Sequence, residues 1–404
     1  MIQAGVGISK GADAYQAAYT AAKTAMERAG TGVNFLFVFA SPALHPEDVV
    51  RGVKEAAGAV PFIGCSTAGE ISNEGPSQKS IGVMAIRSDT LSFYTGIGRD
   101  IAKDAREAGR AVAREVQQKA AATSSARSAL RAFVMLPDVL AGNGADIVRG
   151  VADVLGAHFP IVGGAAGDDF MFEKTYEYHN DGVVSGAVMG VGLAGTATIG
   201  IGVRHGWVPI GMPMKVTRAE GAVLHELDGK PAISIYEDYF GAKAEELRKE
   251  ALARLAITYP LGLKIPEYPE EYLIRDPITV NKDGSITCAA EIPEGSEVRL
   301  MIGSKEKAID AAQDAARHLM KDFEIAKTKP SFLLIFNCIA REKLFAQKAG
   351  DEIHAIMEIV GHDVPMLGFY TYGEQAPLGG EVRNMEKCDP RFYNETVVLF
   401  AVGE

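Results

Sequence analysis

Three short glycine-containing segments, each carrying an acidic residue, are the first candidates for chemistry in this sequence. They are Cys65-Ser66-Thr67-Ala68-Gly69-Glu70, Gly164-Ala165-Ala166-Gly167-Asp168 and Phe369-Tyr370-Thr371-Tyr372-Gly373-Glu374. Glycine permits positive φ and lets a ligand or another backbone approach closely, and loops at strand ends are common ligand-binding positions in α/β proteins. We therefore predict a ligand site shared by Glu70, Asp168 and Glu374. The alternative is that the glycines only form turns and the acids cap N–H groups of their own loops.

Two arginines and two tyrosines extend this predicted site. Arginine binds carboxylate or phosphate bidentately, so Arg275 and Arg341 are predicted to pair with ligand charge; alternatively, each forms a salt bridge with a neighbouring acid. Tyr370 and Tyr372 are two residues apart on an extended segment and should point to one face, where they would close over the ligand or pack in the core. The complete predicted ligand-binding set is Cys65, Ser66, Thr67, Glu70, Asp168, Arg275, Cys338, Arg341, Tyr370, Thr371, Tyr372 and Glu374.

Two cysteines would be the nucleophiles if the protein were an enzyme. Cys65 ends a predicted strand inside a glycine-rich loop, and Cys338 lies three residues before Arg341, whose guanidinium would lower the pKa of the thiol. The spacing around Cys65 is not that of a nucleophile elbow, and a small buried side chain is the alternative for both cysteines. We predict no catalytic residue, and a cysteine-dependent hydrolase or transferase is an alternative.

The histidines show no metal-ligand spacing such as H-x-x-x-H, so no metal site is predicted. A single axial histidine is enough to hold haem. His179, His205 and His362 are the candidates, and the sequence does not choose among them. We predict no cofactor, with haem as the alternative.

A repeated strand–helix–strand unit positions the three acidic segments. Each unit has an apolar strand, an amphipathic helix and a Pro-x-x-Gly sequence that leads into the acidic segment. The predicted strands are 35–40, 132–136 and 331–336, and the helices begin near Glu47, near Asp146 and after Arg341. A fourth, degraded copy would end at Pro260-Leu261-Gly262. Extended segments between the copies, at 81–86, 91–98, 182–206 and 297–302, predict additional antiparallel strands.

The predicted fold class is mixed α/β, with two related halves built from these repeated units and added antiparallel strands. A length of 404 residues favours two domains. We expect an N-terminal domain over 1–215, preceded by a helix that Asp13 caps, and a C-terminal domain over 216–404. Residues 182–203 carry no charge but contain seven glycines, so we predict two buried strands that turn near Gly195 rather than a membrane segment.

Bulk composition excludes several classes of partner. A formal net charge of −11 argues against nucleic-acid binding and against docking on an anionic membrane. The four cysteines are scattered with no C-x-x-C pair, and the N-terminus lacks the pattern of a signal peptide. These features predict a cytoplasmic location.

Several segments of the sequence resemble a known family. The segments Pro61–Glu70 and Gly163–Asp168 resemble the N-terminal half of FIST domains, which occur in prokaryotic signalling and in some eukaryotic F-box proteins. The segments Leu227–Ala232, Tyr272–Pro277, Phe336–Arg341 and Gly368–Glu374 resemble the C-terminal half. The resemblance covers residues 30–390 in the family's order.

The resemblance implies a sensory module that binds small ligands, such as amino acids, and that is often fused to kinases, cyclases or chemotaxis receptors. No output domain remains here once the two halves are counted, so signalling would pass through a partner protein. The predicted function is an intracellular sensor of a small, polar or anionic ligand, and not an enzyme. Because some members resemble haem-based nitric oxide sensors, a gas sensor is an alternative.

Overall fold

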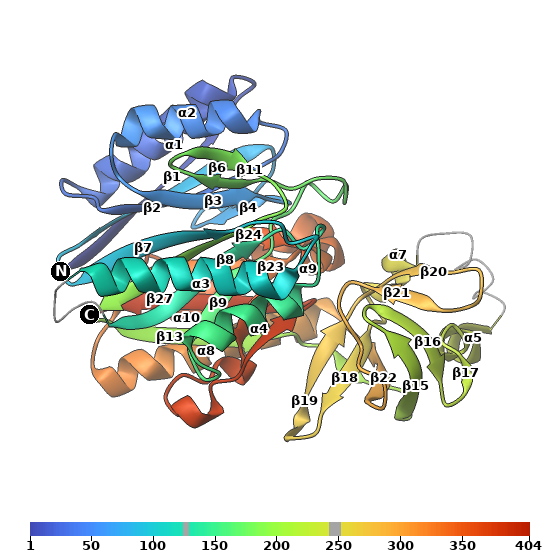
Figure 1. Cartoon of the computed structure of the whole chain (residues 1–404). Coiled ribbons are helices and arrows are strands. Elements are labelled where there is room, and N and C mark those ends of the chain that lie inside the picture. Colours follow the sequence, from blue (N-terminus) through green and yellow to red (C-terminus); the bar gives the residue numbers. More distant parts are fainter. Residues whose placement is uncertain (124–128, 242–251) are drawn as a thin grey trace.

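The computed structural model describes residues 1–123, 129–241 and 252–404 of the chain. Figure 1 shows a large part built from stacked sheets and helices, which we call the body, and a smaller part on the right, which we call the lobe. The lobe runs from Val208 to Ile302, and the body contains the described residues on either side of it. Both termini lie in the body, where the backbone N–H of Ile2 donates to a carboxylate oxygen of Glu404 at 2.7 Å.

The body contains three copies of one chain path, which runs strand, helix, strand, helix, strand, hairpin, strand. The first copy consists of β1 (Ile2–Lys10), α1 (Ala14–Ala29), β2 (Phe35–Ala40), α2 (Pro46–Ala57), β3 (Phe62–Ser66), the hairpin β4 (Glu70–Ser72) and β5 (Gly75–Ser77), and β6 (Ser80–Ser88). The second consists of β7 (Leu91–Gly98), α3 (Ala105–Ala122), β8 (Leu130–Pro137), α4 (Gly144–Leu155), β9 (Ile161–Gly164), the hairpin β10 (Glu177–His179) and β11 (Gly182–Val184), and β12 (Val188–Gly195).

The third copy follows the same path with the lobe inserted after its first strand. It consists of β13 (Thr198–Arg204), α8 (Lys305–Ala326), β23 (Pro330–Cys338), α9 (Ile339–Phe345), η2 (Ala346–Lys348), α10 (Ala349–Val360), β24 (Met366–Thr371), β25 (Glu374–Pro377), β26 (Pro390–Tyr393) and β27 (Val397–Gly403). Two 3-10 turns, η3 (Leu378–Gly380) and η4 (Met385–Lys387), separate the two strands of its hairpin.

Each copy gives its hairpin to the sheet of another copy. The strand orders of the three body sheets are β1-β6-β2-β3-β10-β11, β7-β12-β8-β9-β25-β26 and β13-β27-β23-β24-β4-β5. The central pairs β2–β3, β8–β9 and β23–β24 are parallel, and the flanking strands are antiparallel to them. Because every sheet is completed by a hairpin from elsewhere, we expect the three sheets to fold as one unit.

Steric contacts explain why the Pro-x-x-Gly sequence is repeated. A Cβ atom at Gly64, Gly163 or Gly368 would lie 1.9, 1.9 or 2.1 Å from the carbonyl oxygen of the residue paired with it on the parallel neighbour. Only glycine allows this approach of the two strands. The repeat is therefore a packing requirement of the sheet in every copy.

The charge-free, glycine-rich stretch contains the two predicted strands, β12 and β13, and also the short hairpin strand β11, which the prediction missed. β12 and β13 are joined by a turn at Gly195, whose φ is +115°. Gly202 faces α8, and a Cβ atom there would lie 2.1 Å from the carbonyl oxygen of Ala315. Among the described residues, no helix combines the length and the apolar character needed to cross a membrane.

The lobe is an antiparallel sheet with short helices. Its strand order is β19-β18-β22-β15-β16-β21-β20, with β14 beside β22 and β17 beside β16. Its elements are β14 (Val208–Pro209), β15 (Met214–Glu220), β16 (Val223–Leu227), β17 (Lys230–Pro231), α5 (Ser234–Phe240), α7 (Ala253–Ala256), β18 (Leu261–Ile265), β19 (Tyr268–Arg275), β20 (Pro277–Val280), β21 (Ile286–Cys288) and β22 (Glu297–Ile302).

The mixed α/β class and the repeated units with added antiparallel strands are confirmed. Asp13 caps α1 as predicted, since its carboxylate accepts from the backbone N–H of Gln16 at 2.9 Å. The degraded fourth copy is wrong, because β18 is antiparallel to both of its neighbours in the lobe. The expected division at 215/216 lies within β15, and the third body sheet draws strands from both sides of that division.

Candidate functional site

All twelve residues of the predicted ligand-binding set are buried, with at most 6% of each residue exposed. The fold separates them into three groups. One group surrounds Glu70 and Asp168, a second surrounds Glu374, and Arg275 lies at the junction of the lobe with the body.

The acids at equivalent positions in the three copies are Glu70, Glu177 and Glu374. Each begins a hairpin strand and pairs with the end of a parallel strand in another sheet, opposite Phe369, Cys65 and Gly164 respectively. The prediction that Asp168 is the counterpart of Glu70 and Glu374 is therefore wrong. The second loop is longer than the other two, and Asp168 lies inside it while Glu177 takes the equivalent position.

Glu70 is held by hydroxyl groups. Thr67 donates to one carboxylate oxygen at 2.6 Å, and Ser80 donates to the other. Burial raises the pKa of Glu70 to about 8, although both hydroxyl donors act in the opposite direction. Nearby, the Ser66 hydroxyl donates to the carbonyl of Gly167 at 2.7 Å, which fixes the loop of the second copy against that of the first.

Asp168 caps its own loop, as the structural alternative stated. Its carboxylate accepts from the backbone N–H groups of Phe172, Glu173 and Lys174 at 2.8, 2.6 and 2.9 Å. The Tyr372 hydroxyl donates to the same carboxylate, so this tyrosine bridges the second and third copies.

The group around Glu374 lies apart from this loop. One oxygen of Glu374 accepts from the backbone N–H of Thr396 at 3.1 Å, and the Thr371 hydroxyl donates to the carbonyl of Gly373 at 2.8 Å. Burial raises the pKa of Glu374 well above its ordinary value. Glu374 thus belongs to a different hydrogen-bonded set from Glu70 and Asp168, although Tyr372 lies only two residues before it.

Neither cysteine has the electrostatic environment of a nucleophile. Burial raises the pKa of the Cys65 thiol well above its ordinary value, and the carboxyl groups of Glu177 and Glu70 act in the same direction. The expectation that a guanidinium lowers the pKa of Cys338 is wrong, because burial and the neighbouring Glu374 raise it. Both side chains are therefore thiols at neutral pH, which does not favour the cysteine-dependent enzyme.

The N–H groups of Arg341 all donate to other groups of the protein. It donates to Glu352 from Nε at 2.9 Å and again from Nη2, and its remaining N–H groups donate to the carbonyl oxygens of Ala308, His205 and Glu395. Arg341 and Glu352 are both fully buried. The predicted alternative of a salt bridge therefore describes Arg341, with Glu352 as the acid.

The three haem candidates are placed differently. His205 is held as an acceptor by the backbone N–H of Trp207 at 3.0 Å, and burial, with nearby Arg341, lowers its pKa to about 4. His362 contacts Glu358 on the surface at 3.2 Å, and Nδ1 of His179 accepts from the backbone N–H of Asp181 at 3.2 Å. Among the described side chains, no three His, Cys, Asp or Glu residues are placed to hold a metal ion.

Arg275 lines a groove between the lobe and the body, which we call the junction groove. Its Nε donates to the carbonyl of Glu291 at 2.8 Å, and its Nη1 donates to the carbonyls of Ile274 and Phe392 at 3.0 and 3.3 Å. Within the described part of the chain, the side-chain hydrogen bonds of Arg275 go to backbone carbonyls, and no carboxylate lies within ion-pair distance. Burial lowers the pKa of Arg275 to about 10, and the attraction of Glu291 offsets part of that effect.

The junction groove has an inner and an outer part. The inner cavity has a volume of about 120 Å³, and the outer cavity has about 690 Å³. Leu263, Leu273, Pro293 and Arg391 line both cavities. The walls thus combine apolar side chains with charged groups of both signs, and the outer volume is within the usual range for small-molecule sites.

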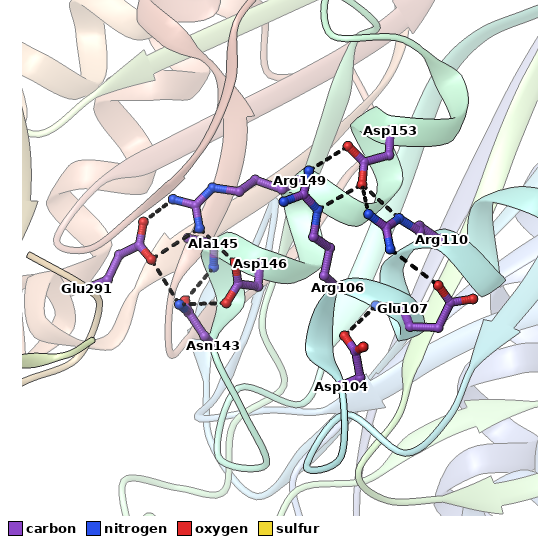
Figure 2. A network of polar contacts seen from close by, with 10 residues as sticks. All are labelled: Asp104, Arg106, Glu107, Arg110, Asn143, Ala145, Asp146, Arg149, Asp153 and Glu291. Carbon is purple, nitrogen blue, oxygen red and sulfur yellow. Dashed lines mark hydrogen bonds and ion pairs between the residues drawn. The ribbon is translucent and has the colours of Figure 1, made fainter. Parts of the chain in front are cut away.

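Figure 2 shows a polar network that includes Arg149 and Glu291, two residues that line the inner cavity. Arg149 on α4 donates to the Glu291 carboxylate of the lobe from both Nη1, at 3.1 Å, and Nη2. Asn143 donates to the same carboxylate at 3.0 Å, and Asp146 accepts from Arg149 at 2.8 Å. Glu291 is therefore an anchor of the lobe on the body.

Two sequence profiles match this chain, the FIST N domain over residues 34–230 and the FIST C domain over residues 232–377. The chain belongs to the FIST family. FIST domains are associated with small-ligand sensing.

Relatives of this chain match different shares of it. An uncharacterized protein of Methanocaldococcus jannaschii is 30% identical over 213 residues, which are 49% of this chain and 39% of that protein. An uncharacterized protein of Mycobacterium tuberculosis is 24% identical over 406 residues, which are 93% of this chain and 95% of that protein. The crystal structure of cyanuric acid hydrolase from A. caulinodans covers 99% of both chains at 12% identity, but its TM-score of 0.36 supports no conclusion.

Sequence reasoning missed Glu177, Arg149 and Glu291. Glu177 begins a hairpin as Glu70 does, but the longer preceding loop hides the correspondence. Arg149 lies in a helix that was correctly predicted. Glu291 has no local signal, because its partner Arg149 is 142 residues away in the sequence.

Proposed function

We propose that this FIST protein is a cytoplasmic sensor that holds a small polar ligand in the junction groove and signals through a partner protein. The observation that carries the proposal is Arg275, a buried guanidinium that lacks a carboxylate partner and lines the groove. Burying a cation without a counter-charge is costly. A ligand that supplies the missing acceptor would offset this cost.

The position of the groove supports a sensory role. Its walls come from the lobe and from the body, so a ligand bound there contacts both parts. A ligand that binds one lobe orientation better than another shifts the population toward that orientation. A partner protein that recognises the same orientation would then report ligand binding.

Native mass spectrometry of protein purified directly from its host tests the proposal. We expect a mass excess that corresponds to one bound small molecule per chain. Arg275→Gln should lose this excess, whereas Arg317→Gln, a change at an exposed arginine on α8, should retain it. A correctly folded wild-type protein without any bound molecule, whose capture of partners from host lysate does not change with added metabolites, would contradict the sensory role.

A further inference from the structure

Glu291, which belongs to the network in Figure 2, also lines the inner cavity, so the junction groove already contains an anion of the protein itself. The Glu291 carboxylate lies on Arg149 and Asn143 of the body, and its residue's carbonyl accepts from Arg275. Glu291 is partly exposed, with 18% of its side chain accessible, so its carboxylate borders solvent. The carboxylate thus lies in a preformed anion site that is not permanently closed.

Charge balance in the groove defines what can enter. Arg391 is paired with Asp389 at 2.6 Å, and Lys264 is paired with Glu297 at 3.4 Å. With Glu291 in place, the two cations Arg149 and Arg275 are matched in number by two acids, Glu291 and Asp146, although neither carboxylate contacts Arg275. A second carboxylate would therefore be repelled. If Glu291 leaves, the two cations Arg275 and Arg149 outnumber the remaining acid, Asp146, so the site is net positive and offers hydrogen-bond donors. An incoming carboxylate is therefore favoured only when it replaces Glu291.

The outer cavity adds a requirement for an apolar group. Leu263, Ile265, Leu273, Pro266 and Pro293 contribute to its wall. Apolar surface that enters this cavity leaves water, which favours binding in proportion to the area buried. The ligand should therefore carry its charge at one end and an aliphatic or aromatic group at the other.

We propose that the junction groove binds a carboxylate with an apolar tail, and that the ligand carboxylate displaces Glu291 from Arg149 and pairs with Arg275. This inference rests on the proposed function and specifies its ligand class and switch. When Glu291 is displaced, the lobe loses its ion pair to α4. Ligand binding and the ion pair between lobe and body then oppose each other, and this coupling acts equally in both directions.

Isothermal titration calorimetry with hexanoate, hexylamine and acetate tests the ligand class. Hexanoate should bind more tightly than acetate, because acetate lacks the tail, and hexylamine should not bind. Glu291→Gln should bind hexanoate about fivefold more tightly, because no charged competitor is displaced. Arg275→Lys should bind it about tenfold more weakly, since a lysine ammonium cannot donate to the three backbone carbonyls that Arg275 holds and to a ligand as well.

A matched control comes from the other side of the same network. Asp153 accepts from Arg106 at 2.8 Å and pairs with Arg110 at 2.7 Å, but it does not line the groove. Asp153→Asn should therefore leave hexanoate affinity unchanged. Hydrogen exchange gives a second measurement: hexanoate should speed exchange in residues 289–292 of the wild type, while Glu291→Gln should exchange quickly there without any ligand.

The results separate this inference from the proposed function. Hexylamine binding as tightly as hexanoate, or Glu291→Gln binding hexanoate no better than the wild type, would overturn the displacement of Glu291 by a carboxylate. Recovery of an Arg275-dependent, uncharged molecule from native protein would overturn the ligand class and leave the sensory role standing. Hexanoate binding that alters no partner interaction would contradict the sensory role and leave the ligand class standing.

Discussion

Replacing Arg341 by methionine is expected to destabilise the fold strongly, because the change leaves a buried carboxylate without its cation. Glu352 is fully buried and accepts from Arg341 through two nitrogen atoms. Removing one partner of a buried ion pair costs about 3–5 kcal/mol. Asn337 still donates to the other oxygen of Glu352 at 2.8 Å, so we expect a loss near the lower limit, about 3 kcal/mol.

Urea denaturation measures this loss as the change in the free energy of unfolding. Arg317→Met is the control, because the Arg317–Asp314 pair is 51% and 60% exposed and should contribute less than about 1 kcal/mol. The double variant Arg341→Met with Glu352→Leu should recover most of the loss, since it removes both buried charges.

A single Arg341→Met variant that unfolds within about 1 kcal/mol of the wild type would refute this reasoning. Glu352 would then not depend on the guanidinium, and a ligand-binding role for Arg341 would again be open. A lower stability combined with unchanged ligand affinity would support the purely structural role of this arginine.

Three further predictions concern the body. Gly64→Ala should destabilise the protein by about 3 kcal/mol or more in urea denaturation, because its Cβ would meet a backbone carbonyl, whereas Gly11→Ala, with no atom within 4 Å, should not. The folded state keeps the Glu70 proton up to about pH 8, whereas the unfolded state releases it near the ordinary pKa of 4.5. The protonated Glu70 therefore contributes to the free energy of unfolding at low pH, and this contribution is lost as the pH rises from about 4.5 to about 8. The free energy of unfolding, measured by urea denaturation, should therefore fall less for Glu70→Gln than for the wild type across that pH interval. Iodoacetamide at neutral pH should modify Cys65 and Cys338 only after unfolding, as mass spectrometry would report; rapid modification of the folded protein would restore the cysteine-enzyme hypothesis.

The sequence by itself determined the local elements and their repetition. Strand Phe35–Ala40, strand Leu91–Gly98 and the cap at Asp13 all lie where local patterns predicted them. The Pro-x-x-Gly repeat could also be recognised from the sequence. Each glycine is required because a Cβ atom would clash with the neighbouring strand of the same strand–helix–strand unit, and this requirement recurs in every copy. Such requirements act between residues that are close in the sequence, so each segment contains a recognisable local pattern.

Only the tertiary structure decided which copy completes which sheet and which charges meet. A hairpin strand that begins with Glu70 or Glu177 has the same local pattern whichever sheet receives it, so pairing is fixed by long-range packing. Long-range packing also decides the contact of the lobe with the body, where Glu291 pairs with Arg149, 142 residues away in the sequence. Charge pairing depends on distance in space and carries no period along the chain, which is why the junction groove became visible only after the chain was folded.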